Sequence, residues 1–157
     1  MMKKKIIIFG ATGNVGSYLL KYALDYFPHS KYDIIASGRR KTDFFDKMGV
    51  EYHAVDLTCE ADFDKLPTDN IHAVMLLSAQ IPSYMDTYQP KKYIDSIVVG
   101  GYNVLEFCRK YHVDRIIYTQ TVFDVSSYPH DIVLKADAKP NFSYVGDPAV
   151  YVIAKNT

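Results

Sequence analysis

The sequence predicts an α/β fold, a doubly wound parallel sheet with helices on both faces, in one domain over residues 1–157. Two observations support this prediction. Apolar segments rich in β-branched residues alternate with segments of helical periodicity, which indicates parallel strands joined by right-handed crossovers. A glycine-rich turn joins the first apolar segment to the first helical one, and such sheets bind phosphate groups at this turn.

The first strand is expected over 6–9, and its continuous apolar run is typical of a central strand buried on both faces. The turn that follows, GATGNVG, has Gly-x-x-Gly-x-x-Gly spacing. One glycine allows a tight turn, one lets the backbone approach a phosphate, and one lets the next helix pack closely on the strand. The alternative is a purely structural turn. The cofactor contacts expected here are Gly10, Thr12, Gly13, Asn14, Val15 and Gly16.

The next elements follow from periodicity and capping residues. A helix is expected over 15–27, with a buried stripe of Val15, Leu19, Ala23 and Tyr26. A second strand is expected over 32–37 and a third over 50–55. Between these strands we expect a short helix capped by Thr42 and ended by Gly49, with inward-facing Phe44, Phe45 and Met48.

The second half of the chain continues the alternation. Thr58 is expected to cap a helix that ends near Leu66, and a buried strand is expected over 73–78. The longest helical pattern covers 91–111, with a predicted buried stripe of Ile94, Val98, Tyr102, Leu105 and Cys108. A fifth strand is expected over 115–119 and a last helix from Pro148 onward. The intervening 121–148 has no strong pattern, as expected for a lid or substrate loop.

Composition and charge narrow the function classes. The chain has 18 basic and 18 acidic residues, which argues against nucleic-acid or membrane-surface partners, because these favour a basic excess. Cys59 and Cys108 lack metal or redox spacing and the five histidines lack ligand spacing, so no metal is expected. The chain shows neither a signal-peptide pattern nor an apolar run of membrane-spanning length, so we expect a cytoplasmic protein.

Three segments together resemble the extended short-chain dehydrogenase/reductase family, which includes NAD-dependent epimerases and dehydratases of nucleotide sugars. They are the glycine turn at 10–16, VVGGYNVLEFCRK at 98–110, and Tyr151-x-x-x-Lys155. The resemblance implies a Rossmann-type fold and an NAD(P)-dependent reaction at a hydroxyl or carbonyl. It covers essentially the whole chain but only the amino-terminal part of such an enzyme. We therefore expect a truncated chain that lacks the carboxyl-terminal substrate domain and does not turn over a sugar substrate by itself.

Tyr151 and Lys155 are the expected catalytic pair, one helical turn apart. A phenol has a pKa near about 10, and a nearby ammonium lowers it by favouring the phenolate. Tyr151 would then remove a proton from a substrate hydroxyl while hydride moves to the nicotinamide ring. The resemblance implies that Lys155 also holds the nicotinamide ribose. The alternative is a surface pair on an exposed helix, and Tyr88 with Lys92 is interpreted as a chance match of the same spacing.

Thr121 falls at the position of the family's third catalytic group, a hydroxyl after the fifth strand. A threonine hydroxyl can make the required hydrogen bond to the substrate oxygen. The segment departs from the family pattern, because Gln120 interrupts the usual run of serines and the usual Val-Tyr-Gly is absent after it. These departures leave the substrate unassigned. The alternative role for Thr121 is a strand-end hydroxyl that bonds the local backbone.

The end of the second strand favours NADP over NAD. An acidic residue there would bind the ribose 2′-OH of NAD, whereas this chain has Ser-Gly followed by Arg39 and Arg40. A guanidinium pairs well with a phosphate, and Arg39 is the better candidate, although a solvated basic loop is the alternative. The resemblance adds cofactor contacts at the ends of the third and fourth strands and on the long helix, namely Asp56, Leu57, Ser78, Ala79, Gln80 and Asn103.

Three functions follow from these patterns. The first is an NAD(P)-dependent epimerase, dehydratase or reductase that acts on a small-molecule substrate, with a nucleotide sugar as the leading candidate and a homodimer as one option for assembly. The second is a non-catalytic module that senses NAD(P) and regulates a partner, and the third is a reductase of a small carbonyl compound. The Tyr–Lys pair favours an enzyme, because a sensor has no need of it.

Overall fold

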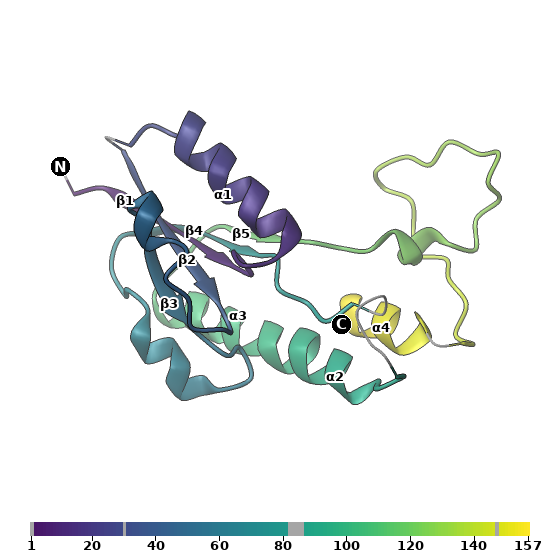
Figure 1. The fold of residues 1–157 in the computed structure, drawn as a ribbon. Coiled ribbons are helices and arrows are strands. Elements are labelled where there is room, and N and C mark those ends of the chain that lie inside the picture. The colour runs from purple at the N-terminus through teal and green to yellow at the C-terminus, as the bar shows by residue number, and fades with distance from the viewer. Residues whose placement is uncertain (1, 30, 82–86, 147) are drawn as a thin grey trace.

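The computed structural model describes residues 2–29, 31–81, 87–146 and 148–157, and its centre is a parallel sheet (Figure 1). The strand order is β3-β2-β1-β4-β5, and the order of the strands changes direction between β1 and β4. This is the arrangement of a doubly wound Rossmann-type sheet, so the predicted fold class is confirmed. The strands are β1 (Lys4–Phe9), β2 (Tyr32–Gly38), β3 (Glu51–Ala54), β4 (Ile71–Leu76) and β5 (Ile116–Tyr118).

Helices cover both faces of the sheet, with α1 on one face and α3 on the other (Figure 1). A continuous helical run forms the second layer and consists of α2 (Lys91–Tyr93), the π-helical η4 (Ile94–Val99) and α3 (Gly100–Lys110). The other helices are α1 (Asn14–Tyr26), η1 (Asp46–Met48), η2 (Glu60–Lys65), η5 (Val122–Val125) and α4 (Pro148–Lys155).

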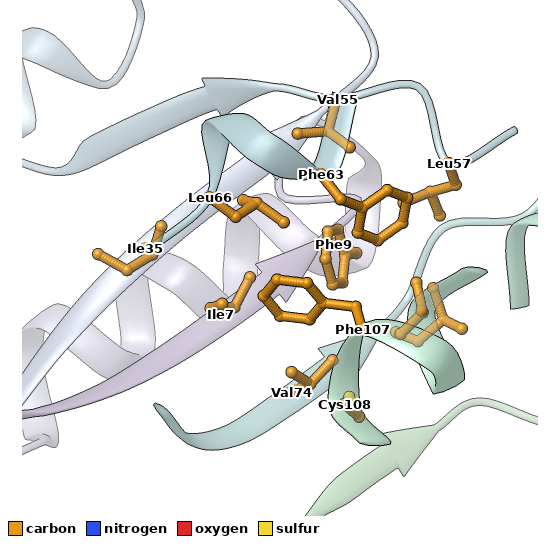
Figure 2. Close-up of a cluster of buried hydrophobic side chains, with 12 residues drawn as sticks. Ile7, Phe9, Ile35, Val55, Leu57, Phe63, Leu66, Val74, Phe107 and Cys108 are labelled. Carbon is orange, nitrogen blue, oxygen red and sulfur yellow. The ribbon is translucent and has the colours of Figure 1, made fainter. Parts of the chain in front are cut away.

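Alternate residues of β1 face two different cores. Ile7 and Phe9 pack with η2 and α3 in the cluster of Figure 2, which includes Phe63, Phe107 and Cys108. Ile6 and Ile8 face the other way and pack with buried residues of α1. Because β1 is covered on both sides, every one of its apolar side chains is buried, which contributes about 1.5–3 kcal/mol for each large side chain.

The buried stripe of α1 differs from the predicted one. Val15 is 63% exposed and Tyr26 is 69% exposed, whereas Gly16, Leu20 and Ala23 are buried. The inner face is set by the close approach of the helix to the turn before it. A Cβ added at Gly16 would lie 2.1 Å from the carbonyl oxygen of Gly10, so only glycine fits there.

The stripe predicted on the long helix was also wrong at most positions. Tyr102 is 58% exposed and Leu105 is 56% exposed, whereas Ile97 and Val104 are buried. The π-helical η4 has a wider turn, which shifts the phase of the inward face relative to a regular α-helical pattern. The inner face of α3 begins at Gly100, where an added Cβ would lie 3.0 Å from Leu57 Cβ.

Neither predicted cap is found at a helix start. The backbone N–H of Phe44 donates to Thr42 Oγ1 at 3.1 Å, but η1 begins only at Asp46, and its N-cap, Phe45, makes no side-chain cap hydrogen bond. Phe44 is exposed and Phe45 is buried. Thr58 does not cap η2, because its N–H and its hydroxyl both donate to Asp56 Oδ1, at 3.0 and 2.8 Å. An acidic residue nearby can accept the hydrogen bond of a threonine hydroxyl, and the threonine then does not cap the helix. The spacing of residues in the sequence does not predict this competition.

The segment after β5 extends away from the sheet (Figure 1). Its described residues contain η5 and then no helix or strand until α4, in agreement with the absence of a strong pattern over 121–148. β5 is the terminal strand of the sheet, and its three residues, Ile116, Ile117 and Tyr118, are all exposed. The predicted fifth strand corresponds to β5, and the predicted last helix corresponds to α4.

Candidate functional site

The glycine turn at the end of β1 has the backbone geometry of a close-approach turn. Gly10 has φ of +88°, which disfavours other residues, and a Cβ there would lie 2.8 Å from the backbone nitrogen of Ser78. Gly13 is the N-cap of α1 and makes no side-chain cap hydrogen bond. The N–H groups of the first turn of α1 are thus available to an anion, together with the positive end of the helix dipole.

A cleft of about 700 Å³ lies at the carboxyl ends of the strands, beside this turn. Its volume is within the range of about 300–1,000 Å³ found for small-molecule sites. Residues at or just after the ends of β1, β2, β3 and β4 line it, namely Phe9, Ser37, Val55 and Leu77. The predicted cofactor contacts that line it are Gly10, Thr12, Gly13, Arg39, Arg40, Asp56, Leu57, Ser78, Ala79 and Gln80.

Other predicted cofactor contacts lie outside the residues that line the cleft. Asn14 and Val15 are exposed on α1, and Gly16 packs behind the turn. Asn103 is buried on α3, and its Nδ2 donates to the carbonyl oxygen of Leu57 at 2.8 Å. Asn103 therefore positions a residue that lines the cleft.

The end of β2 is held from β3 by a residue that the sequence did not single out. The hydroxyl of Tyr52 donates to the carbonyl oxygen of Gly38 at 3.0 Å and also contacts the carbonyl oxygen of Arg40. The Tyr52 ring stacks on Phe45, with ring centroids 4.8 Å apart. Burial raises the pKa of Tyr52, so the hydroxyl stays protonated and able to donate. The only sequence signal was an aromatic residue in an alternating strand.

Position 38 itself is too crowded for a side chain. A Cβ added at Gly38 would lie 2.7 Å from Thr12 Oγ1 of the glycine turn. Beside it, Ser37 is fully buried and lines the cleft, and among the described residues its Oγ has no hydrogen-bond partner. Arg39 and Arg40, which follow directly, are exposed and line the cleft.

The three predicted catalytic residues come from two elements that pack together. Tyr151 and Lys155 are on α4 and are 5% and 3% exposed, while Thr121 lies just after β5. The Thr121 side chain lies close enough to Tyr151 to lower the pKa of its hydroxyl. Lys155 Nζ donates to the carbonyl oxygen of Thr119 at 2.8 Å and lies 4.6 Å from the centre of the Tyr118 ring.

The environment of Tyr151 differs from the one expected. Burial raises the pKa of Tyr151 above its ordinary value, the Thr121 side chain lowers it, and the carboxylate of Asp124 raises it. Its ring packs edge-on against Tyr93 and Phe123, at centroid distances of 5.6 and 6.4 Å. The expected lowering of this pKa by Lys155 is not among the causes of the shift, and the Lys155 ammonium donates to the carbonyl oxygen of Thr119 just after β5.

Burial lowers the pKa of Lys155, and the negative charge of Asp124 opposes that shift. The pair adjoins the cleft without lining it. Ala79, which lines the cleft, packs against the cluster that contains Tyr151, and the N–H of Gln80 donates to Ser96 Oγ at 3.2 Å. Tyr88, which has the same spacing to Lys92, is exposed before α2. Ala79, just after β4, therefore contacts both the cleft and the cluster that contains Tyr151.

Two further features concern other classes of site. Within the described ranges, no group of three His, Cys, Asp or Glu side chains is arranged to hold a metal ion. Within the same ranges, none of the helices combines the length and apolar character needed to cross a bilayer.

The comparisons with known proteins agree with this geometry. The sequence profile of the NAD dependent epimerase/dehydratase family matches residues 6–155. Protein CapI of Staphylococcus aureus is 27% identical over 125 residues, which are 74% of this chain and 37% of that protein.

Solved structures share the fold. UDP-glucose 4-epimerase of Thermus thermophilus in complex with NAD has a TM-score of 0.74 at 20% identity, covering 96% of this chain and 47% of that one. UDP-glucose 4-epimerase from Bifidobacterium longum in complex with NAD⁺ and UDP has a TM-score of 0.76 at 16% identity, covering 98% and 46%. The chain thus spans less than half the length of these three proteins.

Proposed function

Because the chain belongs to the NAD dependent epimerase/dehydratase family, we propose that it forms the cofactor-binding part of an NADP-preferring oxidoreductase that acts on a nucleotide sugar. The observation that carries the proposal is the cleft at the carboxyl edge of the sheet, where the glycine turn and the end of β4 face the same space as Arg39. The remaining substrate contacts would come from polypeptide beyond these residues, because the relatives are more than twice as long.

The residues of the cleft fit a dinucleotide. The N–H groups at the start of α1 would bind the pyrophosphate, and the glycine turn lets the backbone approach it. Arg39, with Arg40 beside it, would pair with a ribose 2′-phosphate. Asp56 and Leu57 would lie near the adenine, while Ser78, Ala79 and Gln80, just after β4, would border the nicotinamide ribose. These assignments are supported by the residues that line the cleft.

The proposed chemistry uses Tyr151, Thr121 and Lys155. A bound nicotinamide ring supplies the capacity to accept and return a hydride. Thr121 would hydrogen bond the substrate oxygen, and Tyr151 would take the proton of the substrate hydroxyl. An ammonium has three N–H donors, so the bond from Lys155 to Thr119 leaves two to hold the ribose and to favour the phenolate of Tyr151.

A second function, an NAD(P)-sensing module without catalysis, is supported by one observation. Tyr151 is buried against Tyr93 and Phe123 and does not line the cleft. A sensor needs the dinucleotide cleft but does not need Tyr151 and Lys155 to be accessible to a substrate. The two functions differ in the expected effect of Tyr151→Phe on the complete enzyme, because only an oxidoreductase would lose turnover while keeping its affinity for the cofactor.

The cofactor class is tested by fluorescence titration of the chain with NADPH and with NADH. We expect tighter binding of NADPH, and we expect Arg39→Ala to remove the difference while leaving the affinity for NADH unchanged. Lys139→Ala, which removes an exposed cation from the extended segment, is the control for net charge. Tenfold tighter binding of NADH by the unmodified chain would contradict the preference, and no binding of either would contradict the function.

A further inference from the structure

Two side chains join the segment after β5 to the end of α4. Asn156 Nδ2 donates to Asp124 Oδ1 at 2.7 Å, across 32 positions of sequence. The same Nδ2 donates to the carbonyl oxygen of Val152 at 2.9 Å, one turn back on α4. An amide NH₂ group has two N–H donors, so this one is fully used in linking the two elements.

Backbone hydrogen bonds hold Asp124 in an ordered turn. The backbone N–H of Asp124 donates to the carbonyl oxygen of Thr121 at 3.2 Å, and the backbone carbonyl oxygen of Asp124 accepts from the N–H of Asn141 at 2.6 Å. The turn begins at Thr121, whose Oγ1 accepts from the N–H of Phe123 at 3.3 Å.

The carboxylate faces titratable groups from two elements. Besides Tyr151 and Lys155 on α4, its charge acts on Tyr118 of β5, whose pKa is raised mainly by burial. Tyr93 of α2 packs against the other side of the Tyr151 ring. An anion here favours a protonated ammonium and disfavours a phenolate.

We propose that Asp124 is a positioning residue, which acts through Asn156 to fix the last turn of α4, and with it Lys155, beside the end of β5. Its charge also opposes the lowering of the Lys155 pKa by burial. A role of Asp124 in hydride transfer rests on the proposed function. The hydrogen bonds from Asn156 to Asp124 and Val152 do not depend on that function.

Two variants separate the hydrogen bond from the charge. Asp124→Asn removes the charge but keeps an oxygen that accepts from Asn156, whereas Asn156→Ala removes the donor and keeps the charge. Asn156→Leu is a second removal of the donor, with a side chain of similar size. Asp131→Asn, an exposed change in the same extended segment, is the matched control.

The measurements are made by NMR on the cofactor-free chain. Amide hydrogen exchange of Val152 to Lys155 reports on the last turns of α4, and the amides of β1 report on folding. Titration of ¹³C-labelled tyrosine and lysine side chains reports the pKa of Tyr151 and Lys155. We expect Asn156→Ala to speed exchange in α4 about 3- to 10-fold, the effect of one lost hydrogen bond, with β1 unchanged. We expect Asp124→Asn to lower the pKa of both Tyr151 and Lys155, with exchange in α4 changed less than about 2-fold.

The link is rejected if neither Asn156 variant speeds exchange in α4, and the role of the charge is rejected if Asp124→Asn behaves like Asp131→Asn. NADPH titration of the same samples separates this inference from the proposed function. If both effects are seen but the chain binds no dinucleotide, the link is supported and the proposed function is contradicted. If the chain binds NADPH but neither effect is seen, only the link is contradicted.

Discussion

The hydroxyl of Tyr52 donates to the carbonyl oxygen of Gly38 at 3.0 Å, and this bond ties β3 to the end of β2 that precedes the two arginines. The strand ends that border the cleft are thereby fixed relative to each other. A small change at Tyr52 is expected to act on a cofactor that Tyr52 itself does not contact.

Tyr52→Phe is expected to weaken NADPH binding about threefold to tenfold, because one hydrogen bond of about 0.5–1.5 kcal/mol holds the Arg39 loop in place. The stacking of the ring on Phe45 is retained in this variant. Fluorescence titration with NADPH measures the effect, and Tyr26→Phe on the exposed side of α1 is the control. Equal affinities for Tyr52→Phe and the unmodified chain would show that the loop is held by other contacts.

Gly16→Ala is expected to destabilise the chain by several kcal/mol and to abolish NADPH binding. Its Cβ would lie 2.1 Å from the carbonyl oxygen of Gly10, so α1 has to move away from the turn. Gly101→Ala is the matched control, since it lies in α3 with nothing within 4 Å of the added Cβ. The control is expected to stabilise the chain by about 0.5–1 kcal/mol, because alanine favours a helix. Urea denaturation measures both changes, and equal effects of the two would contradict the crowding argument.

Asn103→Ala is expected to lower the free energy of unfolding by about 1–3 kcal/mol, because it leaves the carbonyl oxygen of Leu57 without its buried donor. The affinity for NADPH should fall as well, since Leu57 lines the cleft. Leu105→Ala, on the exposed side of α3, should stay within about 0.5 kcal/mol of the unmodified chain. Chemical denaturation and NADPH titration test the two effects, and a stable Asn103→Ala variant would show that water replaces the amide.

Cys108 is expected to make the free energy of unfolding fall as the pH rises above 9. Burial raises the pKa of its thiol from 9.0 to about 11, so the folded chain keeps a proton that the unfolded chain loses. The resulting stability is fully present below pH 9 and is lost as the pH rises toward 11, by on the order of 2 kcal/mol at 1.36 kcal/mol for each pH unit.

Urea denaturation of the chain and of Cys108→Ala at pH 8 to 11 checks this dependence. The difference in unfolding free energy between the two should shrink with rising pH, whereas Cys59→Ala, which changes an exposed thiol, should run parallel to the unmodified chain. A constant difference for Cys108→Ala would rule out the buried thiol as the source.

The sequence predicted the features that depend on local chemistry. Each of these features is visible in a short stretch of neighbouring residues. They are the glycine turn, the alternation of apolar and helical segments, and the position of the last helix. The inner faces of α1 and α3 depend instead on where two backbones approach, at Gly16 and Gly100, and on the wider turn of η4. Tyr52 was missed because its hydrogen bond joins two strands, and the burial of Tyr151 depends on rings from two other elements.

The strand β5, at the border of the sheet, has a practical consequence. Ile116, Ile117 and Tyr118 are exposed there on a strand with one neighbour, β4. Unpaired backbone groups beside apolar side chains form a template for edge-to-edge association. A preparation of these 157 residues alone should therefore become turbid at high concentration, and a charged substitution such as Ile117→Lys should delay that aggregation.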